Sequence, residues 1–371
     1  MKIAVIGAGP SGAVAAYALA RDGADVSLFE RSMWPREKAC GDGLTPSSVA
    51  LLDEIGIALP PRSRFAQTLV TGPSGSGFRA SWPSGMPDGT TCERIDFDAL
   101  LVDAAIAAGA RFFDRTSVES IASGTLVVRG PEGDERTERF DAIALGEGGT
   151  GALAARAGLP PFAMRLGAYR GYVTTTRDLA PEYQVHYAGP FVPGYAWVFP
   201  VASRRANVGA VLASRGDVRK RLGAWLESES ARGALGDIGP LESGRGGVIA
   251  IGRARRCVDR LFAIGDAAGI ADPLSAEGVS QAMRSGLLLR DALRASGGDV
   301  TRAAATYERD LRAFDANNRE ALRMRKLFAL MAGPMTTLAA KRPRLARHVI
   351  ATGYFPKRDA SWFFGTFAAL R

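Results

Sequence analysis

The hydrophobic positions of this chain follow two periods, and both appear within the first 29 residues. Lys2–Ile6 is a short apolar run, 10–22 is an alanine-rich segment closed by Gly23, and 26–29 is a second apolar run. A strand, a helix and a strand at this spacing form a βαβ unit, the start of a parallel sheet. The pattern therefore predicts an α/β fold at this end of the chain.

Further elements are marked by the residues at their ends. Thr45 suits an N-cap, with Pro46 at the first helical position and Gly56 just past the end. A second helix is expected over about 96–108, before Gly109. Strands are expected at 111–118, 125–129, 136–145, 168–176, 183–187, 195–200, 206–212 and 261–264, and helices at 217–230 and from 277 nearly to the end.

The order of these elements predicts a discontinuous domain. Parallel-sheet elements occupy 1–65, 92–165 and 245–300, sheet-rich segments of different character lie at 66–91 and 166–244, and 301–371 is helical and basic. We therefore expect an α/β fold with an α+β insertion. It would comprise a Rossmann-type domain, a substrate-binding domain with a mixed antiparallel sheet, and C-terminal helices.

Composition excludes several classes of protein. The 371 residues are 47% hydrophobic and 23% charged, enough for a large core. Three separated cysteines, Cys40, Cys92 and Cys257, are not a disulfide framework. With only His186 and His348, neither a metal site nor a Ser-His-Asp hydrolase is expected. No signal-peptide pattern and no run of 18 apolar residues occurs, so we expect a cytoplasmic protein.

The net charge of +9 is concentrated at the carboxyl end. Residues 319–371 hold 11 Lys or Arg against the two acids Glu320 and Asp359, a net +9. The basic residues alternate with Leu, Phe, Met and Trp, which favours helices packed on the body over a nucleic-acid-binding tail. The outer face of these helices is either simply solvated or makes a peripheral contact with an anionic membrane.

The turn Gly7-Ala8-Gly9-Pro10-Ser11-Gly12 joins the first strand to the first helix. Its first Gly permits the tight turn, its second lets a pyrophosphate approach, and its third lets helix and strand pack closely. The helix N-terminus favours that anion. Glu30 lies 18 residues after Gly12 and suits the ribose hydroxyls, and we assign the adjacent Arg31 to the same site. This pattern fits NAD as well as FAD.

A second segment decides between these cofactors. The strand 261–264 ends in Gly265-Asp266 and leads into small residues. It resembles the second FAD fingerprint of glutathione-reductase-type flavoproteins, in which the Asp, here Asp266, holds a ribityl hydroxyl. Pro273 and then Gly278-Val279 begin a helix whose N-terminal amides would stabilise the negative charge of a reduced flavin. The two fingerprints in this order predict FAD.

Three further segments resemble one family. They are Lys-Ala-Cys-Gly-Asp-Gly-Leu-Thr-Pro at 38–46, Pro-Gly-Tyr-Ala-Trp-Val-Phe-Pro at 193–200 followed by Ala-Asn-Val-Gly at 206–209, and Gly265-Asp266 with Pro273 and Glu277-Gly278. Together they look like the geranylgeranyl reductase family, a branch of the p-hydroxybenzoate-hydroxylase-like FAD oxidoreductases. The first segment is closest to the menaquinone-reductase-like branch. The resemblance covers about residues 1–300.

This resemblance implies an activity and a set of site residues. Family members use reduced FAD to saturate C=C bonds of isoprenoid lipids, such as a geranylgeranyl group or a menaquinone side chain, by hydride transfer. The residues carried over to the cofactor are Cys40 and Gly41 beside the isoalloxazine, Arg94 at the FAD phosphates and Val118 on the adenine. Those carried over to the substrate are Gly43, Tyr195, Trp197 and Phe199.

Three side chains are candidates for the chemistry. Reduction of a C=C bond needs a proton donor near the flavin, and the Cys40 thiol is mostly protonated near neutral pH. Alternatively, Cys40 is a small buried residue that only shapes its turn. Tyr195 is a competing donor, and Trp197 is the third candidate. Tyr195, Trp197 and Phe199 share one strand face, which is core, tunnel wall or both.

Two departures from the family pattern limit what the resemblance implies. Ala276 stands where relatives commonly have Gly. The segment 146–151 has Glu147 and Gly151 where NADPH-using relatives have Asp and Ser. The second departure puts direct NADPH use in doubt, so the sequence leaves open whether NADPH or another external reductant supplies the electrons.

Related flavoproteins define the alternatives. An FAD-dependent aromatic monooxygenase is the runner-up function. Flavin halogenases carry a Trp-x-Trp-x-Ile-Pro segment that 195–200 partly matches. The lysine that they require after the second strand has no convincing match, because no lysine occurs between Lys38 and Lys220. A flavin-binding protein with a structural or sensing role is a third class.

Overall fold

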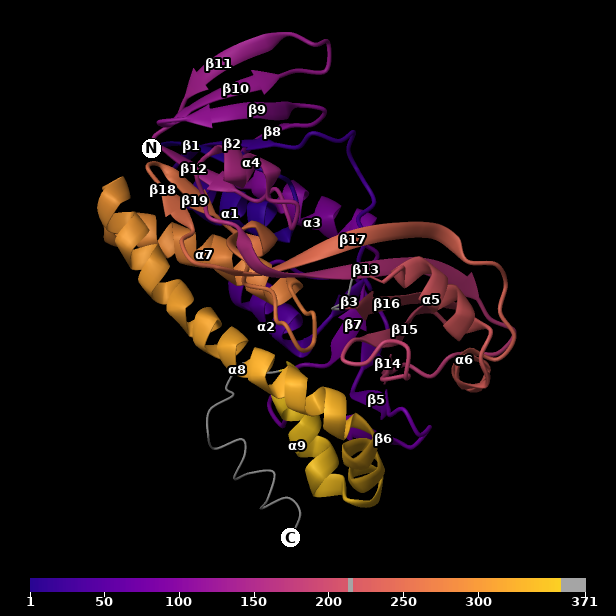
Figure 1. Ribbon diagram of the computed structural model, residues 1–371. Coiled ribbons are helices and arrows are strands. Elements are labelled where there is room, and N and C mark those ends of the chain that lie inside the picture. Colours follow the sequence, from indigo (N-terminus) through magenta and orange to yellow (C-terminus); the bar gives the residue numbers. More distant parts are fainter. Residues whose placement is uncertain (213–215, 355–371) are drawn as a thin grey trace.

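The computed structural model describes residues 1–212 and 216–354, and Figure 1 shows two main sheets within them. The first sheet has the strand order β18-β19-β12-β1-β2-β8. Its strands are β1 (Lys2–Ile6), β2 (Asp25–Phe29), β8 (Arg111–Phe113), β12 (Ala142–Leu145), β18 (Cys257–Val258) and β19 (Leu261–Ala263). β1 pairs in parallel with β2 and β12, which confirms the predicted βαβ start.

Helices with small, apolar side chains pack on this sheet. They are α1 (Pro10–Arg21), α3 (Arg94–Ala107) and α7 (Val279–Ala295), and a short helix, α4 (Ala152–Arg156), follows β12. Ala13, Val14 and Ala15 of α1 are fully buried. A Cβ on Gly286 of α7 would lie 2.8 Å from the Ala15 nitrogen. The two helices can therefore pack this closely only with glycine at that position.

A three-stranded antiparallel sheet lies at one end of this unit (Figure 1). It consists of β9 (Ser117–Ala122), β10 (Thr125–Arg129) and β11 (Glu135–Arg139). The single strands predicted at 111–118 and 136–145 are therefore wrong. Arg115, with φ +46°, turns the chain between β8 and β9, and Phe140 and Asp141 separate β11 from β12. Each predicted strand is divided between two sheets.

The second main sheet has the order β17-β13-β16-β15-β14-β5-β6 and is antiparallel except between β14 and β5. Its strands are β5 (Gln67–Thr71), β6 (Gly77–Ser81), β13 (Phe162–Thr174), β14 (Tyr183–His186), β15 (Tyr195–Ala202), β16 (Arg205–Leu212) and β17 (Glu242–Arg253). This is the mixed sheet expected of the insertion. The boundaries predicted after residues 165 and 244 fall within β13 and β17, the two long strands of Figure 1.

Two short helices, α5 (Val218–Leu226) and α6 (Glu229–Leu235), cover one face of this second sheet. The prediction of a single helix over 217–230 is wrong because a new N-cap interrupts it. The Ser228 Oγ accepts a hydrogen bond from the Ala231 N–H at 3.3 Å. Ala196 and Val198 of β15 pack beneath the helices with Trp225.

A small sheet has the strand order β3 (Gly43–Leu44), β7 (Gly89–Thr91) and β4 (Arg64–Phe65). β3 comes before α2 (Pro46–Ile55) in the chain, and β4 and β7 come after it. The caps of α2 are those predicted from the sequence. The Thr45 side chain accepts from the Ser48 N–H at 3.4 Å, and Gly56 ends the helix with φ +76°.

The C-terminal helix α8 (Val300–Lys341) extends along both sheets, and α9 (Pro343–Tyr354) lies beside β6 at its far end (Figure 1). The Tyr307 hydroxyl donates to the Ala263 carbonyl at 2.9 Å, and Ala339 packs with Trp82 beside β6. The predicted C-terminal helices are confirmed, while 355–371 lies outside the described residues. None of the helices in the described ranges combines the length and apolar character that a bilayer crossing needs.

Candidate functional site

The glycine turn after β1 leaves one open position beside the backbone. Gly7 has φ +92°, and a Cβ there would collide with the Gly146 carbonyl oxygen. A Cβ on Gly9 would meet only the guanidinium ends of Arg36 and Arg94, at 3.8 and 3.9 Å. The space at Gly9 therefore lies between two cations and the N-terminus of α1, which fits a pyrophosphate group.

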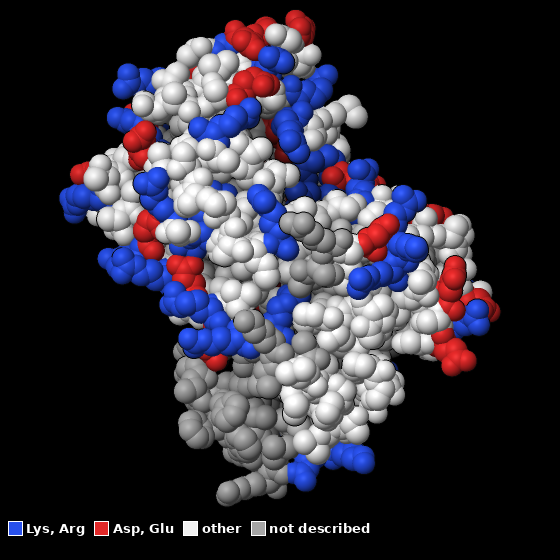
Figure 2. Space-filling view, in the orientation of Figure 1, with Lys and Arg blue, Asp and Glu red and all other residues white. Residues whose placement is uncertain are grey.

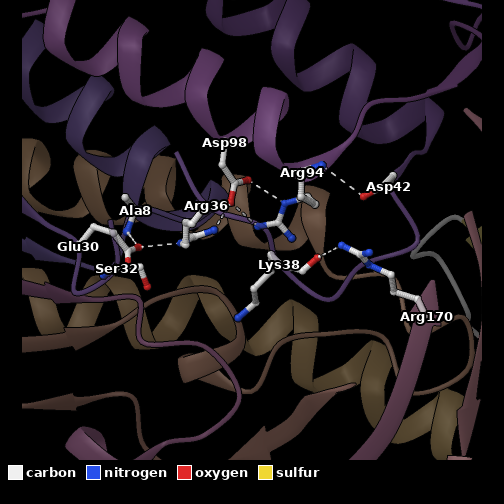
Figure 3. A network of polar contacts seen from close by, with 9 residues as sticks. All are labelled: Ala8, Glu30, Ser32, Arg36, Lys38, Asp42, Arg94, Asp98 and Arg170. Carbon is white, nitrogen blue, oxygen red and sulfur yellow. Dashed lines mark hydrogen bonds and ion pairs between the residues drawn. The ribbon is translucent and has the colours of Figure 1, made fainter. Parts of the chain in front are cut away.

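A row of ion pairs orients these two arginines (Figure 3). Asp98 is fully buried and accepts from Arg36 Nη1 at 2.8 Å and from Nε and Nη2 of Arg94 at 2.7 Å. Burial opposes the charge on Arg94, but Asp98 outweighs it and raises the Arg94 pKa. Sequence reasoning found Arg94 and missed Arg36 and Asp98. The position of Asp98 one helical turn after Arg94 was a usable signal.

Glu30 lies at the other end of this row. Its buried carboxylate accepts from the Ala8 N–H at 3.2 Å, the Ser32 N–H at 3.0 Å and Arg36 Nε at 3.0 Å (Figure 3). Three acceptor positions are used, so about one is left for a ribose hydroxyl. The predicted cofactor residue Arg31 is exposed. The arginine that contacts the Glu30 carboxylate is Arg36.

The second fingerprint touches the first. Gly265 has φ +59°, and a Cβ there would lie 2.6 Å from the Ser11 Oγ. The half-buried Asp266 carboxylate accepts no hydrogen bond from the part of the chain that the structure describes, and burial raises its pKa. Gly278 caps α7 with its Cβ position 3.4 Å from Asp266 Oδ1. A carboxylate with free acceptor capacity thus lies at the N-terminus of α7, which suits a polyol chain.

Apart from Val118, the other predicted cofactor residues lie on these same elements or directly before α7. Pro10 and Gly12 are buried in the first turn of α1, Pro273 is buried before α7, Val279 begins α7, and Val118 is half-buried on β9. The site thus offers an anion position between cations, a buried acid for a ribose and a free carboxylate for a ribityl chain. This donor set fits FAD.

Asp42 holds the Cys40 loop against the second sheet. Its buried carboxylate, on a residue with φ +61°, accepts from the Tyr172 hydroxyl at 2.6 Å and from Asn207 Nδ2 at 2.8 Å. The same Asn207 amide group donates to the Cys40 carbonyl at 2.8 Å. Burial raises the Asp42 pKa, and these hydrogen bonds lower it in part. Sequence reasoning identified this loop but missed the roles of Asp42, Tyr172 and Asn207.

Two arginines complete the clamp on this loop (Figure 3). Arg170, which is 2% exposed, donates from Nη2 to the Lys38 carbonyl at 3.0 Å and from Nη1 to the Ser243 carbonyl at 2.9 Å. The Arg94 N–H donates to Asp42 Oδ1 at 3.3 Å. The loop is therefore fixed both by the inserted sheet and by α3.

Tyr195, Trp197 and Phe199 share one face of β15, as predicted, and this face packs on the Cys40 loop. Neighbouring ring centroids are 6.2 and 6.1 Å apart. A Cβ on Gly41 would lie 3.0 Å from the Phe199 ring and 3.1 Å from Trp197 Nε1. One on Gly43 would lie 3.3 Å from the Phe199 ring. The two glycines let the loop lie directly on the aromatic rings.

The three candidate donors differ in what their protons contact. The Tyr195 hydroxyl donates to the Ser275 carbonyl, and Trp197 Nε1 donates to Asn207 Oδ1 at 2.9 Å. The Cys40 thiol is half-buried and donates no hydrogen bond within the described residues. Burial raises its pKa, so the sulfur keeps its proton at neutral pH. Cys40 is thus the one of these three whose proton is uncommitted.

The structure explains what the residues that depart from the family pattern do in this chain. Glu147 accepts from the N–H groups of Leu153 at 2.8 Å and Ala154 at 2.6 Å, so it caps α4. Gly151 has φ +66°, and a Cβ there would lie 2.6 Å from an aromatic ring of β13, which excludes serine. Ala276 has φ +54°, a left-handed conformation in which glycine is unstrained.

Known proteins similar to this chain agree with the geometry. Residues 1–171 match the FAD binding domain family. Menaquinone reductase of Mycolicibacterium smegmatis is 29% identical over 97% of this chain and 93% of its own. Digeranylgeranylglycerophospholipid reductase 1 of Methanopyrus kandleri is 31% identical over 76% of this chain and 78% of its own.

The fold is also known. The structure of a geranylgeranyl bacteriochlorophyll reductase-like protein from Thermoplasma acidophilum has a TM-score of 0.83 at 18% identity, covering 99% of this chain and 95% of that one. Flavin-dependent halogenases and a monooxygenase have this fold too, so the fold alone does not choose the reaction. The relatives in sequence identify the family and confirm that the protein is an oxidoreductase. The match to the FAD binding domain family confirms the cofactor. The chain belongs to the geranylgeranyl reductase family of FAD-dependent oxidoreductases.

Proposed function

We propose that the protein saturates C=C bonds in an isoprenoid lipid, such as a geranylgeranyl group or a menaquinone side chain. One observation carries the proposal: the rings of Trp197 and Phe199 pack against the loop that presents Cys40, and the Tyr195 ring packs next to Trp197. Aromatic faces make extensive van der Waals contact with an alkene chain. The names of the relatives, menaquinone reductase and digeranylgeranylglycerophospholipid reductase, support the lipid class.

Each residue has a role in this proposal. Bound FAD, once reduced, supplies the hydride. Tyr195, Trp197 and Phe199 would hold the chain, exclude water and orient the double bond. Cys40 would give its thiol proton to the second carbon and recover a proton from solvent, and its raised pKa keeps the proton in place until then.

The cofactor would be held by residues from several elements. Gly9 with Arg36 and Arg94 would bind the pyrophosphate, Glu30 a ribose hydroxyl and Asp266 a ribityl hydroxyl. The Cys40 loop would then lie beside the isoalloxazine, because the aromatic rings of β15 close its other side.

One experiment separates this function from the monooxygenase alternative. The FAD-loaded enzyme is reduced chemically without oxygen and mixed with geranylgeranyl diphosphate or menaquinone, and the products are weighed by mass spectrometry. A gain of about two mass units in the isoprenoid chain, one hydride and one proton, is expected to remain after the enzyme is removed and any quinol is reoxidised in air. No anaerobic product, together with a gain of one oxygen atom in air, would overturn the reductase proposal.

We also propose that a reductant other than directly bound NADPH reloads the flavin. Glu147 is committed to capping α4, and Gly151 has no room for a side chain. The test mixes oxidised holoenzyme with NADPH without oxygen and follows the flavin absorbance, with dithionite as the positive control. Rapid bleaching by NADPH would contradict the proposal.

We further propose that the C-terminal helices contact an anionic membrane. Leu330 and Met331 of α8 are 80% and 40% exposed. The exposed basic residues where α8 meets α9 are Lys341, Arg342, Arg344 and Arg347. On the face drawn in Figure 2, the lower end of the described surface carries basic and uncharged side chains. Exposed apolar residues and a basic cluster at its C-terminal end, both on or next to α8, suit an anionic lipid surface.

A vesicle assay tests this contact. The four basic residues are replaced by Gln, and the holoenzyme is sedimented with vesicles of anionic or of zwitterionic phospholipid. Binding to anionic vesicles is expected for the unchanged protein and should fall about tenfold or more in the variant. Unaltered binding of the variant would reject this surface.

A further inference from the structure

Arg325 of α8 is a buried cation that no carboxylate of the described residues contacts directly. The residue is 6% exposed, and its Nη1 donates to the Pro273 carbonyl. Its Nη2 is buried and has no hydrogen-bond partner, and Arg325 forms no ion pair with any residue that the structure describes. An arginine stays protonated even when buried. A buried charge with a free donor is costly unless an acceptor lies against it.

The surroundings place this guanidinium at the end of the aromatic face. The titratable groups that act on it are Tyr195, Tyr187 and Asp272. The Tyr195 hydroxyl donates to the Ser275 carbonyl, two residues from the carbonyl that Arg325 holds. The Tyr187 and Tyr195 rings are 5.8 Å apart. Arg325 therefore borders the rings that the proposed function assigns to the lipid.

Asp272, the acid among these three groups, already accepts hydrogen bonds from the backbone. Asp272 Oδ1 accepts from the N–H groups of Leu274 and Ser275, both at 2.8 Å. It shapes the loop before α7 and acts on the Arg325 guanidinium through its charge, but no hydrogen bond joins the two side chains among the described residues. The free donor of Arg325 consequently points to an acceptor from outside this set of residues.

We infer that Arg325 binds an acceptor oxygen at the polar end of the lipid substrate, a phosphate oxygen or a quinone carbonyl. This inference rests on the proposed function. The bond to the Pro273 carbonyl fixes the plane of the guanidinium, so its second edge is held ready for an oxygen. Anchoring the polar end would fix which double bond lies against Trp197. Arg325 would then determine the position of reduction as well as affinity.

A purely structural role, a link between α8 and the loop, makes a different prediction. Loss of such a link would weaken every ligand alike, whereas loss of an anchor weakens only ligands that carry the oxygen. Three probes of similar chain length separate the two: geranylgeranyl diphosphate, a prenylated naphthoquinone and a hydrocarbon polyene. Each is titrated into oxidised FAD-loaded enzyme, and binding is read from the shift of the flavin absorbance bands.

Arg325→Met should weaken at least one oxygen-bearing probe by roughly tenfold or more and leave the hydrocarbon within about twofold. The head group that loses more affinity identifies the source of the oxygen. Arg325→Lys keeps the charge without the planar guanidinium, so its affinity for the oxygen-bearing probes should lie between those of the unchanged protein and Arg325→Met. It replaces the Met variant in the test if that variant is unstable. Arg323→Met is the matched control, because Arg323 lies on the same helix with a side chain 79% exposed.

The outcomes are distinct. Equal losses for all three probes, or none, would overturn the anchor. Failure of every probe to bind the unchanged enzyme would overturn the proposed function itself. A product reduced at the same double bond by the unchanged protein and by Arg325→Met would remove the role in choosing the position.

Discussion

The Asn207 amide donates to the Cys40 carbonyl at 2.8 Å, and so a residue of the inserted sheet holds the loop of the FAD-binding unit. The same amide group donates to Asp42, and its oxygen accepts from the Trp197 indole. One side chain therefore sets the distance between the proposed proton donor and the proposed substrate wall. The geometry of the reaction depends on this residue although it need not touch the substrate.

Asn207→Ala should lower turnover about tenfold to a hundredfold and leave FAD content near normal. The substitution removes donors to Asp42 and Cys40 and an acceptor from Trp197, each worth about 1–3 kcal/mol when its partner stays buried. Turnover, KM and bound FAD are measured together. Asn317→Ala on α8 is the control at a half-buried site. A rise in KM alone, with kcat unchanged, would argue against a positioning role.

Cys40→Ala should lower turnover about a hundredfold or more without loss of FAD, since general acid catalysis typically contributes that much. The pH profile gives a second readout. Burial raises the thiol pKa, and the donor is active while protonated. The rate should therefore stay flat through the ordinary thiol range near pH 8.5 and fall only above it. Undiminished turnover of the Ala variant would remove Cys40 from the chemistry.

Ala276→Gly should stabilise the protein by roughly 0.5–1 kcal/mol. The left-handed conformation of Ala276, at φ +54°, costs an alanine about 1–2 kcal/mol, and the added freedom of glycine in the unfolded chain offsets part of the gain. Denaturant unfolding measures the change. Ala316→Gly, at an exposed position inside α8, should instead destabilise by about 1 kcal/mol. Two changes of the same sign would contradict the strain argument.

His186 should make the protein less stable as the pH falls from about 6.5 to 4. The ring is 3% exposed, neither nitrogen has a partner among the described residues, and burial lowers its pKa to about 4. The unfolded state, with a pKa of about 6.5, takes up the proton first, so stability present above that value is lost through this window. The loss is about 3 kcal/mol at most.

Unfolding in denaturant at several pH values between 4 and 7 measures this slope. His186→Leu should flatten it, because the group that titrates is gone. His348→Gln on α9, which removes the second histidine of the chain, should leave most of it. A slope unchanged by His186→Leu would assign the acid sensitivity to other groups.

What could be predicted from the sequence follows from how local each signal is. The glycine turn, the caps of α2 and the alternation along β15 are set by neighbours in the chain, and they were predicted correctly. Asp42, Tyr172 and Asn207 form their contacts over separations of 130 and 165 residues, which no local pattern encodes. Arg36 was missed because its role depends on Asp98, 62 residues away.

Element boundaries failed for a related reason. The runs 111–118 and 136–145 were each predicted as one strand, but partners elsewhere in the chain decide which sheet each half joins. Ser228 could have been recognised as a new cap, since serine before a glutamate often starts a helix. The buried charge of Arg325 carries no sequence signal, because α8 contains several arginines and only packing distinguishes them.

The contact of Gly265 with Ser11 has a consequence for the order of events during synthesis. The glycine turn leaves the ribosome early, yet the floor beneath it is built from a segment made more than two hundred residues later. Domains generally fold from the N-terminal side as they emerge. The FAD site described above needs both the glycine turn and Asp266, so it is complete only once most of the polypeptide has been synthesised.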